Sequence, residues 1–109
     1  MNWIKIFHRD VLQGEDFVKK IDVSGKKLCA VKDGDKLFVV QLKCPHAGAD
    51  LSQGWCNNGH LVCPYHRHEF DLETGRGNQG QGNYINTFTL ETRQDGIYIG
   101  VKDTWWKFW

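Results

Sequence analysis

Apolar and polar side chains alternate along the first part of the chain and again near its end. This alternation predicts strands at residues 3–7, 17–23, 27–31, 36–42, 84–91 and 97–101. Asp33-Gly34-Asp35, between two β-branched runs, predicts a hairpin turn. Residues 11–16 fit either a short helix or a turn. Because no segment keeps helical periodicity for long, we predict an all-β fold, a small antiparallel sandwich or barrel.

The alternation fades between residues 44 and 73, where chemically reactive side chains gather. This stretch holds three of the four cysteines, four of the five histidines and both prolines. Its apolar runs are short, at residues 61–62 and 69–72, and stand among turns. A chain of 109 residues suits one domain. We therefore expect a single domain, residues 1–109, in which a reactive subdomain of about residues 43–73 stands on a base formed by the remaining strands.

Composition and charge narrow the classes of partner. Fourteen basic and thirteen acidic side chains leave a net charge of +1, which does not favour binding to nucleic acid through bulk charge. No apolar run approaches the roughly 18 residues of a membrane span, and Lys5, His8, Arg9 and Asp10 interrupt the region where a signal peptide would be apolar. We therefore expect a cytoplasmic protein with no membrane or nucleic-acid partner, in which cysteines bind metal or do chemistry.

Two short motifs in the reactive stretch echo each other. Sixteen residues separate Cys44-Pro45-His46 from Cys63-Pro64-Tyr65-His66. Each motif offers one thiolate and one imidazole, which are good ligands for iron and zinc, and each proline stiffens the backbone. Structural zinc sites usually pair cysteine with cysteine and histidine with histidine. Unlike ligands on each loop suit a cluster in which two thiolates bind one iron and two imidazoles bind the other.

These motifs and their flanks resemble those of Rieske-type 2Fe–2S ferredoxins, the small soluble proteins of oxygenase systems. The first motif continues as Ala-Gly-Ala-Asp-Leu51, and the second is followed by Phe70-Asp71-Leu72 and Thr74-Gly75. The resemblance implies a Rieske-like antiparallel β-sandwich or barrel with a small two-loop subdomain that binds the cluster. It also implies one 2Fe–2S cluster, with the inner iron held by Cys44 and Cys63 and the outer iron, near solvent, held by His46 and His66.

The resemblance further implies a one-electron carrier that is not itself an enzyme. Such ferredoxins take electrons from a flavin-dependent reductase and pass them to an oxygenase, and we expect a monomer that docks through shape and apolar contact around the two histidines. An oxygenase site would need two histidines and a carboxylate, and only His8, His60 and His68 remain. The alternatives are a small regulatory or electron-transfer subunit of another oxidoreductase, or a zinc-binding structural module.

Several positions depart from the high-potential members of this family. Those proteins join the two loops by a disulfide where this chain has Ala49 and Tyr65, and donate hydrogen bonds to the cluster sulfurs where it has His68 and Phe70. Fewer donors lower the potential, so we predict a midpoint near the lower end of the roughly −150 to +300 mV Rieske range. Arg67, in place of a common glycine, adds a cation that offsets part of this loss.

The remaining candidates have simpler interpretations. Cys29 lies in an alternating run and is predicted to be a small buried hydrophobe, and Cys56 an ordinary cysteine in the turn region 53–59. Gly75-x-Gly77-x-x-Gly80 matches a dinucleotide-binding fingerprint, but no helix follows, so we predict that these glycines let backbone pass close to the cluster loops. The aromatic residues at 105–109 are predicted to cover the sandwich, with partner docking as the alternative.

Overall fold

The computed structural model describes residues 2–44, 48–64, 67–77 and 84–101, which form strands and two short 3₁₀ helices. All strand pairs are antiparallel, and they form three three-stranded sheets, β1-β9-β8, β2-β3-β4 and β5-β6-β7. The predicted all-β fold is confirmed. The elements are β1 (Asn2–Phe7), η1 (Arg9–Gln13), β2 (Phe17–Val23), β3 (Lys26–Asp33), β4 (Lys36–Gln41), η2 (Leu51–Gln53), β5 (Trp55–Asn57), β6 (His60–Val62), β7 (Glu69–Asp71), β8 (Leu90–Arg93) and β9 (Gly96–Val101).

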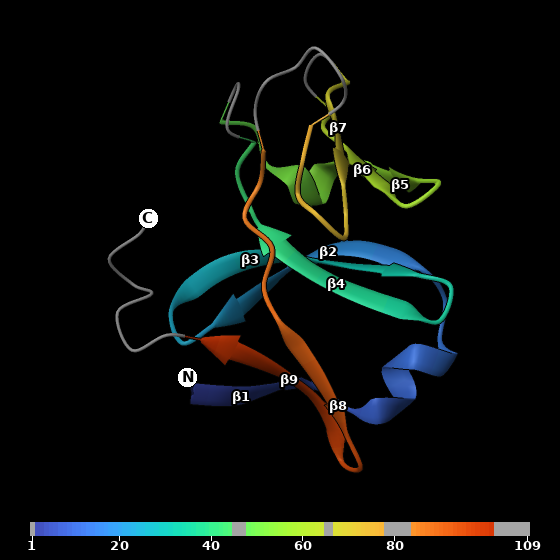
Figure 1. The fold of residues 1–109 in the computed structure, drawn as a ribbon, viewed down its shortest axis with the longest axis vertical. Helices are drawn as coiled ribbons and strands as arrows, with labels where there is room; N and C mark the ends of the chain where they lie inside the picture. The colour runs from blue at the N-terminus through green and yellow to red at the C-terminus, as the bar shows by residue number, and fades with distance from the viewer. Residues whose placement is uncertain (1, 45–47, 65–66, 78–83, 102–109) are drawn as a thin grey trace.

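The three sheets lie one above another, with β2-β3-β4 in the middle (Figure 1). Below it lies the sheet that holds both β1 and β9, and above it lies β5-β6-β7, whose strands fall within residues 43–73. Tight turns join the middle strands. Ser24 and Gly25 both have positive φ, 51° and 85°, as a two-residue hairpin turn requires. Asp33 pairs with Lys36, so the predicted hairpin at residues 33–35 is also confirmed.

Successive side chains of a strand point to opposite sides, so the middle sheet can pack on both of its faces. Leu28 and Ala30 pack in a core with Ile99 of β9. Cys29 and Val31 pack instead in a second core, which also contains residues of the upper sheet. The middle sheet therefore supports the reactive stretch directly, and the alternation along β3 divides its side chains between the two cores.

Residues 84–89 differ from the predicted long strand over 84–91. Only Leu90–Arg93 forms β8. Before it, Ile85 N donates to Gly75 O (2.7 Å) and Phe88 N donates to Val39 O (3.0 Å), so the backbone partner changes within three residues. The segment runs from the upper sheet to the lower one, and it therefore pairs with each neighbour only briefly.

The structure also decides two local predictions. The region 53–59, predicted as a turn, contains β5, because Asn58 and Gly59 have positive φ (51° and 77°) and fold the chain back onto β6. The ambiguous residues 11–16 overlap η1, a 3₁₀ helix that ends at Gln13. The aromatic residues 105–109 lie outside the described residues.

Candidate metal centre

Two of the predicted ligands, Cys44 and Cys63, are buried in one hydrophobic core. Their exposed fractions are 2% and 0%. Cys44 follows β4 and Cys63 follows β6, so the core brings together thiols that are nineteen positions apart in the sequence. None of the four cysteines, all of which lie in the described part of the chain, forms a disulfide. Both ligand cysteines are therefore reduced and are held away from bulk water.

The backbone closes the two loops that begin at these cysteines in the same way. Cys44 N donates to Ala49 O (2.8 Å), and Cys63 N donates to His68 O (2.7 Å). In each loop the residue before the accepting carbonyl has positive φ, 67° at Gly48 and 54° at Arg67. The described ends of the two loops are thus closed in the same way. We call residues 44–49 the first ligand loop and residues 63–68 the second ligand loop.

The two predicted histidine ligands, His46 and His66, lie outside the described residues. Each stands between the two ends of a ligand loop, and the structure describes those ends. The structure therefore brings together the thiols and the closures of both loops, and it leaves the assignment of the imidazoles as a prediction.

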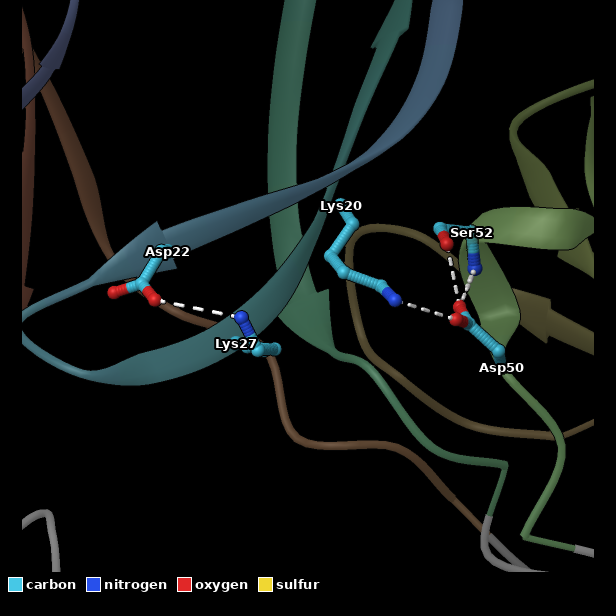
Figure 2. Close-up of polar contacts among 5 residues, drawn as sticks. All are labelled: Lys20, Asp22, Lys27, Asp50 and Ser52. Atoms are coloured by element: carbon cyan, nitrogen blue, oxygen red, sulfur yellow. Dashed lines mark hydrogen bonds and ion pairs between the residues drawn. The ribbon is translucent and has the colours of Figure 1, made fainter.

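An unforeseen residue, Asp50, anchors the end of the first ligand loop (Figure 2). Its Oδ1 accepts hydrogen bonds from the backbone N–H (2.9 Å) and the hydroxyl of Ser52, and its Oδ2 lies 3.1 Å from Lys20 Nζ of β2. Burial on its own raises the pKa of the Asp50 carboxyl, but the Ser52 hydrogen bonds and Lys20 outweigh it and hold the pKa below its usual value. Asp50 therefore ties the loop to both η2 and the middle sheet.

The sequence carried a signal for this anchor. Aspartate is a preferred N-cap residue, because its side chain accepts a hydrogen bond from the backbone N–H two or three residues later. Here that turn is η2, and Asp50 is its N-cap. The partner on β2 carries no such local signal, because Lys20 and Asp50 are brought together only by the packing of β2 beside η2.

A hairpin supports the second ligand loop. In it Leu61 pairs with Phe70 and Val62 with Glu69 across β6 and β7. Phe70 is fully buried in the core that holds both ligand cysteines, and its side chain has no hydrogen-bond donor. The hairpin thus places an apolar ring, without a hydrogen-bond donor, in the core beside both ligand cysteines.

The glycine-rich segment begins at Gly75, a position that only glycine can occupy. Gly75 has φ +79°, and a Cβ there would lie 2.1 Å from the carbonyl oxygen of Ile85. Backbone therefore passes closely at Gly75, but the neighbouring backbone is that of Ile85, so the predicted approach to a ligand loop is not what this glycine serves. Residues 78–83 of the segment lie outside the described residues.

The other two cysteines are not activated nucleophiles. Cys29 is fully buried, as predicted, and burial together with the charge of Asp50 raises the pKa of its thiol to about 12. Cys56 lies on β5 rather than in a turn. Burial, followed by the charge of Asp33, raises the pKa of the Cys56 thiol. A thiol that stays protonated is a poor ligand and a poor nucleophile.

The sequence model of the Rieske [2Fe-2S] domain matches residues 2–89. The chain belongs to the Rieske [2Fe-2S] domain family. This Rieske chain is 29% identical over 77 residues to the ferredoxin component of the naphthalene 1,2-dioxygenase system of Pseudomonas putida, covering 70% of this chain and 72% of that protein. It is 26% identical over 92 residues to human apoptosis-inducing factor 3, covering 84% of this chain but only 15% of the human protein.

A solved structure shares the fold. The ferredoxin of carbazole 1,9a-dioxygenase from Nocardioides aromaticivorans IC177 superposes with a TM-score of 0.80 at 23% identity, over 94% of this chain and all of that one. The predicted Rieske-like fold and the resemblance to Rieske ferredoxins are therefore confirmed. In the described part of this Rieske chain, no helix has the length and apolar character needed to cross a membrane.

The residues present fit the cofactor of the family, a Rieske-type 2Fe–2S cluster. Such a cluster needs two thiolates on one iron, and the Rieske fold here buries Cys44 and Cys63, neither of which is in a disulfide, among apolar side chains. When bound, the cluster would supply a couple that gains and loses one electron. Cys44 and Cys63 would hold it from the apolar core, which keeps water away from the two thiols.

Proposed function

We propose that this chain is a one-electron carrier in which Cys44 and Cys63 bind one iron and His46 and His66 bind the other. The observation that carries the proposal is the pair of thiols buried in one core, each at the start of an equivalently closed loop. The whole chain, residues 1–109, is one Rieske domain, with a cluster-binding subdomain at about residues 43–73. Each histidine stands inside a ligand loop, so the imidazoles form the route for electrons.

The surroundings of the thiols support a low midpoint potential. Phe70 offers no donor to a cluster sulfur, and hydrogen bonds to sulfur stabilise the reduced, more negative cluster. We expect a midpoint near the lower end of the roughly −150 to +300 mV Rieske range. A value above about +100 mV on the same scale would contradict this expectation.

The relatives' names support a place in an oxygenase system. A ferredoxin component stands between a donor and an oxygenase, and we assign a flavin-dependent reductase as the donor and an oxygenase as the acceptor. The carrier works as a monomer in the cytoplasm, a compartment whose reducing poise suits four cysteines that form no disulfide. A chain that purifies only as a fixed subunit of another oxidoreductase would replace this role with the alternative one.

The first test measures the cluster itself. We expect a red-brown protein with about two irons and two sulfides per chain, whose visible absorption bleaches on one-electron reduction. A colourless protein that holds one zinc would identify a structural module instead.

The second test assigns the ligands with matched variants. Cys44→Ser and Cys63→Ser are expected to abolish the visible absorption, whereas Cys29→Ala and Cys56→Ser, which alter the other two cysteines, retain it. His46→Ala and His66→Ala are expected to lose the cluster, with His60→Gln as the matched control. Retention of the full spectrum in Cys44→Ser or His66→Ala would rule out that residue as a ligand.

A further inference from the structure

A mostly apolar groove lies where the three sheets come together. β4 contributes residues 37–39, the turn after β7 contributes Leu72 and Glu73, and the segment that leads into β8 contributes residues 87–90. We call these residues the junction groove, and its volume is about 390 Å³. Figure 1 shows the segment before β8 passing across β4 on its way from the upper sheet to the lower one.

The junction groove exists because this segment changes its backbone partner. Phe88 N donates to Val39 O of β4 (3.0 Å). Leu90, two residues later, already pairs with Ile99 of β9. β4 is the edge strand of its sheet, so no strand in the described part of the chain continues along β4 to Leu37. The two elements diverge from Val39 onward, and the space between them is the groove.

The apolar side chains that line the junction groove are incompletely covered. Four of them are only half-buried: Leu37, Phe38, Phe88 and Leu90. Phe38 packs on the core that holds the ligand cysteines, whereas Phe88 and Leu90 pack on the lower core. The groove therefore crosses the boundary between the two cores. Removing its apolar surface from water is favourable, so a segment that filled it would join the cores.

The chain itself supplies an apolar segment that needs such cover. Residues 102–109 follow β9 in the sequence and lie outside the described residues. Residues 105–109 read Trp-Trp-Lys-Phe-Trp, four aromatic side chains in five positions. Each large aromatic side chain buries about 150–250 Å² when it is covered, so a run of four exposed rings is unfavourable in water.

This aromatic run begins within reach of the junction groove. Gly100 N donates to Thr89 O (2.9 Å), so the end of β9 lies one strand away from a wall of the groove. Neighbouring strands are about 4.8 Å apart. An extended chain spans about 3.3 Å per residue, so residue 105 can lie up to about 13 Å from Val101, and residue 109 about 26 Å. The run therefore reaches the groove without being fully extended.

We propose that residues 105–109 fold back onto their own chain and fill the junction groove with aromatic side chains. A cavity of about 150 Å³ accommodates a benzene ring, so the groove has room for an indole ring. The filled groove ties Leu72 of the cluster-binding subdomain to Leu90 of the base. This inference is independent of electron transfer, because neither ligand loop lines the groove.

The first experiment measures whether the groove and the run stabilise the protein together. A chain that ends at Asp103 is compared with the full chain by thermal unfolding of the protein as purified. The truncation is expected to lower the melting temperature by about 5–10 °C, because it uncovers the groove. Leu37→Gln should cause a similar loss in the full chain and at most a small one in the truncated chain.

Leu37 suits this test because it lines the groove but packs in neither of the two cores. Leu12→Gln is the matched control, since Leu12 is also half-buried but lies on η1 and does not line the groove. Its effect should be the same in the full and truncated chains. An unchanged melting temperature on truncation, or equal effects of Leu37→Gln in both chains, would overturn the proposal.

The second experiment locates the run without depending on global stability. Trypsin cleavage after Lys107 is followed by mass spectrometry under native conditions. Leu37→Gln is expected to raise the cleavage rate constant by about tenfold, whereas Leu12→Gln should leave it unchanged. Equal cleavage in all three proteins would mean that the run lies outside the groove. Protection that rises with protein concentration would place the run in the groove of a second copy, and this also overturns the proposal.

Discussion

The two ligand loops have the same closure but different supports. Both join the N–H of a buried cysteine to a carbonyl five residues later, and both place a left-handed residue just before that carbonyl. The first loop uses Gly48 there and is held from outside by Asp50 and Lys20. The second uses Arg67 and is held by the β6–β7 hairpin. One geometry is thus reached through two different sets of interactions.

The comparison distinguishes the feature that both loops share, the backbone closure, from the features that differ between them. The closure recurs in both loops, so it is tied to the way each loop holds its buried cysteine. The anchor and the identity of the left-handed residue differ between the loops. Variants that alter one loop at a time test this division.

The largest effect is expected beneath the second ligand loop. Phe70→Ala removes a fully buried ring and should lower the free energy of unfolding by about 3–5 kcal/mol, whereas Phe70→Leu should cost less than about 1.5 kcal/mol. Thermal and denaturant unfolding, followed by the visible absorption, measure both. A loss below about 1 kcal/mol in Phe70→Ala would show that the hairpin does not support the loop.

The next effect is expected at the left-handed position of the first ligand loop. Gly48→Ala should cost about 1–2 kcal/mol, because its φ of 67° disfavours a Cβ although nothing lies within 4 Å of that atom. Gly14→Ala is the control, since Gly14 has no positive φ and its nearest contact would be an ordinary 3.6 Å. Equal stability of the two variants would remove backbone conformation as the reason for Gly48.

The anchor of the first ligand loop should show a pH signature. Asp50→Asn is expected to lower stability by about 1 kcal/mol at neutral pH, from the weakened cap and the lost ion pair. The folded-state pKa of Asp50 is lowered, so its contribution is complete above the ordinary value of 3.8 and disappears as the pH falls through the lower folded value. Unfolding of both proteins between pH 7 and pH 3 measures this difference.

The control for this anchor is the other ion pair in Figure 2. Asp22 and Lys27 are both well exposed, with Oδ2 and Nζ 3.6 Å apart, and Asp22→Asn should leave stability nearly unchanged. A difference between Asp50→Asn and the unaltered protein that persists unchanged at pH 3 would mean that the Asp50 charge is not the anchor.

The smallest effect is expected at the left-handed position of the second ligand loop, with the opposite sign. Arg67→Gly should relieve about 1–2 kcal/mol of backbone strain and lose about 0.4–1 kcal/mol through the freer unfolded chain, a net gain of about 0.5 kcal/mol. Denaturant unfolding measures the gain. A loss of stability would show that the arginine side chain contributes to folding.

Much of the fold was predictable because its signals are local. The limits of β2, the hairpin turns and the buried position of Cys29 follow from alternation and turn chemistry, which act within a few residues. The predicted strand over residues 84–91 was too long, because β-forming side chains do not indicate which neighbouring strand a segment pairs with. Ile85 and Phe88 bond to different neighbours, and that choice depends on the crossing of the chain between sheets.

The candidate chemistry of this protein can be read from its sequence, because two motifs that each pair a cysteine with a histidine indicate a cluster with two kinds of ligand. Only the tertiary structure decided that Cys44 and Cys63 share one core, that Lys20 reaches Asp50, and that Arg67 takes the place of Gly48. The physical reason is that ligand type resides in single side chains, whereas burial and ion pairing depend on residues that the fold brings together from distant parts of the chain.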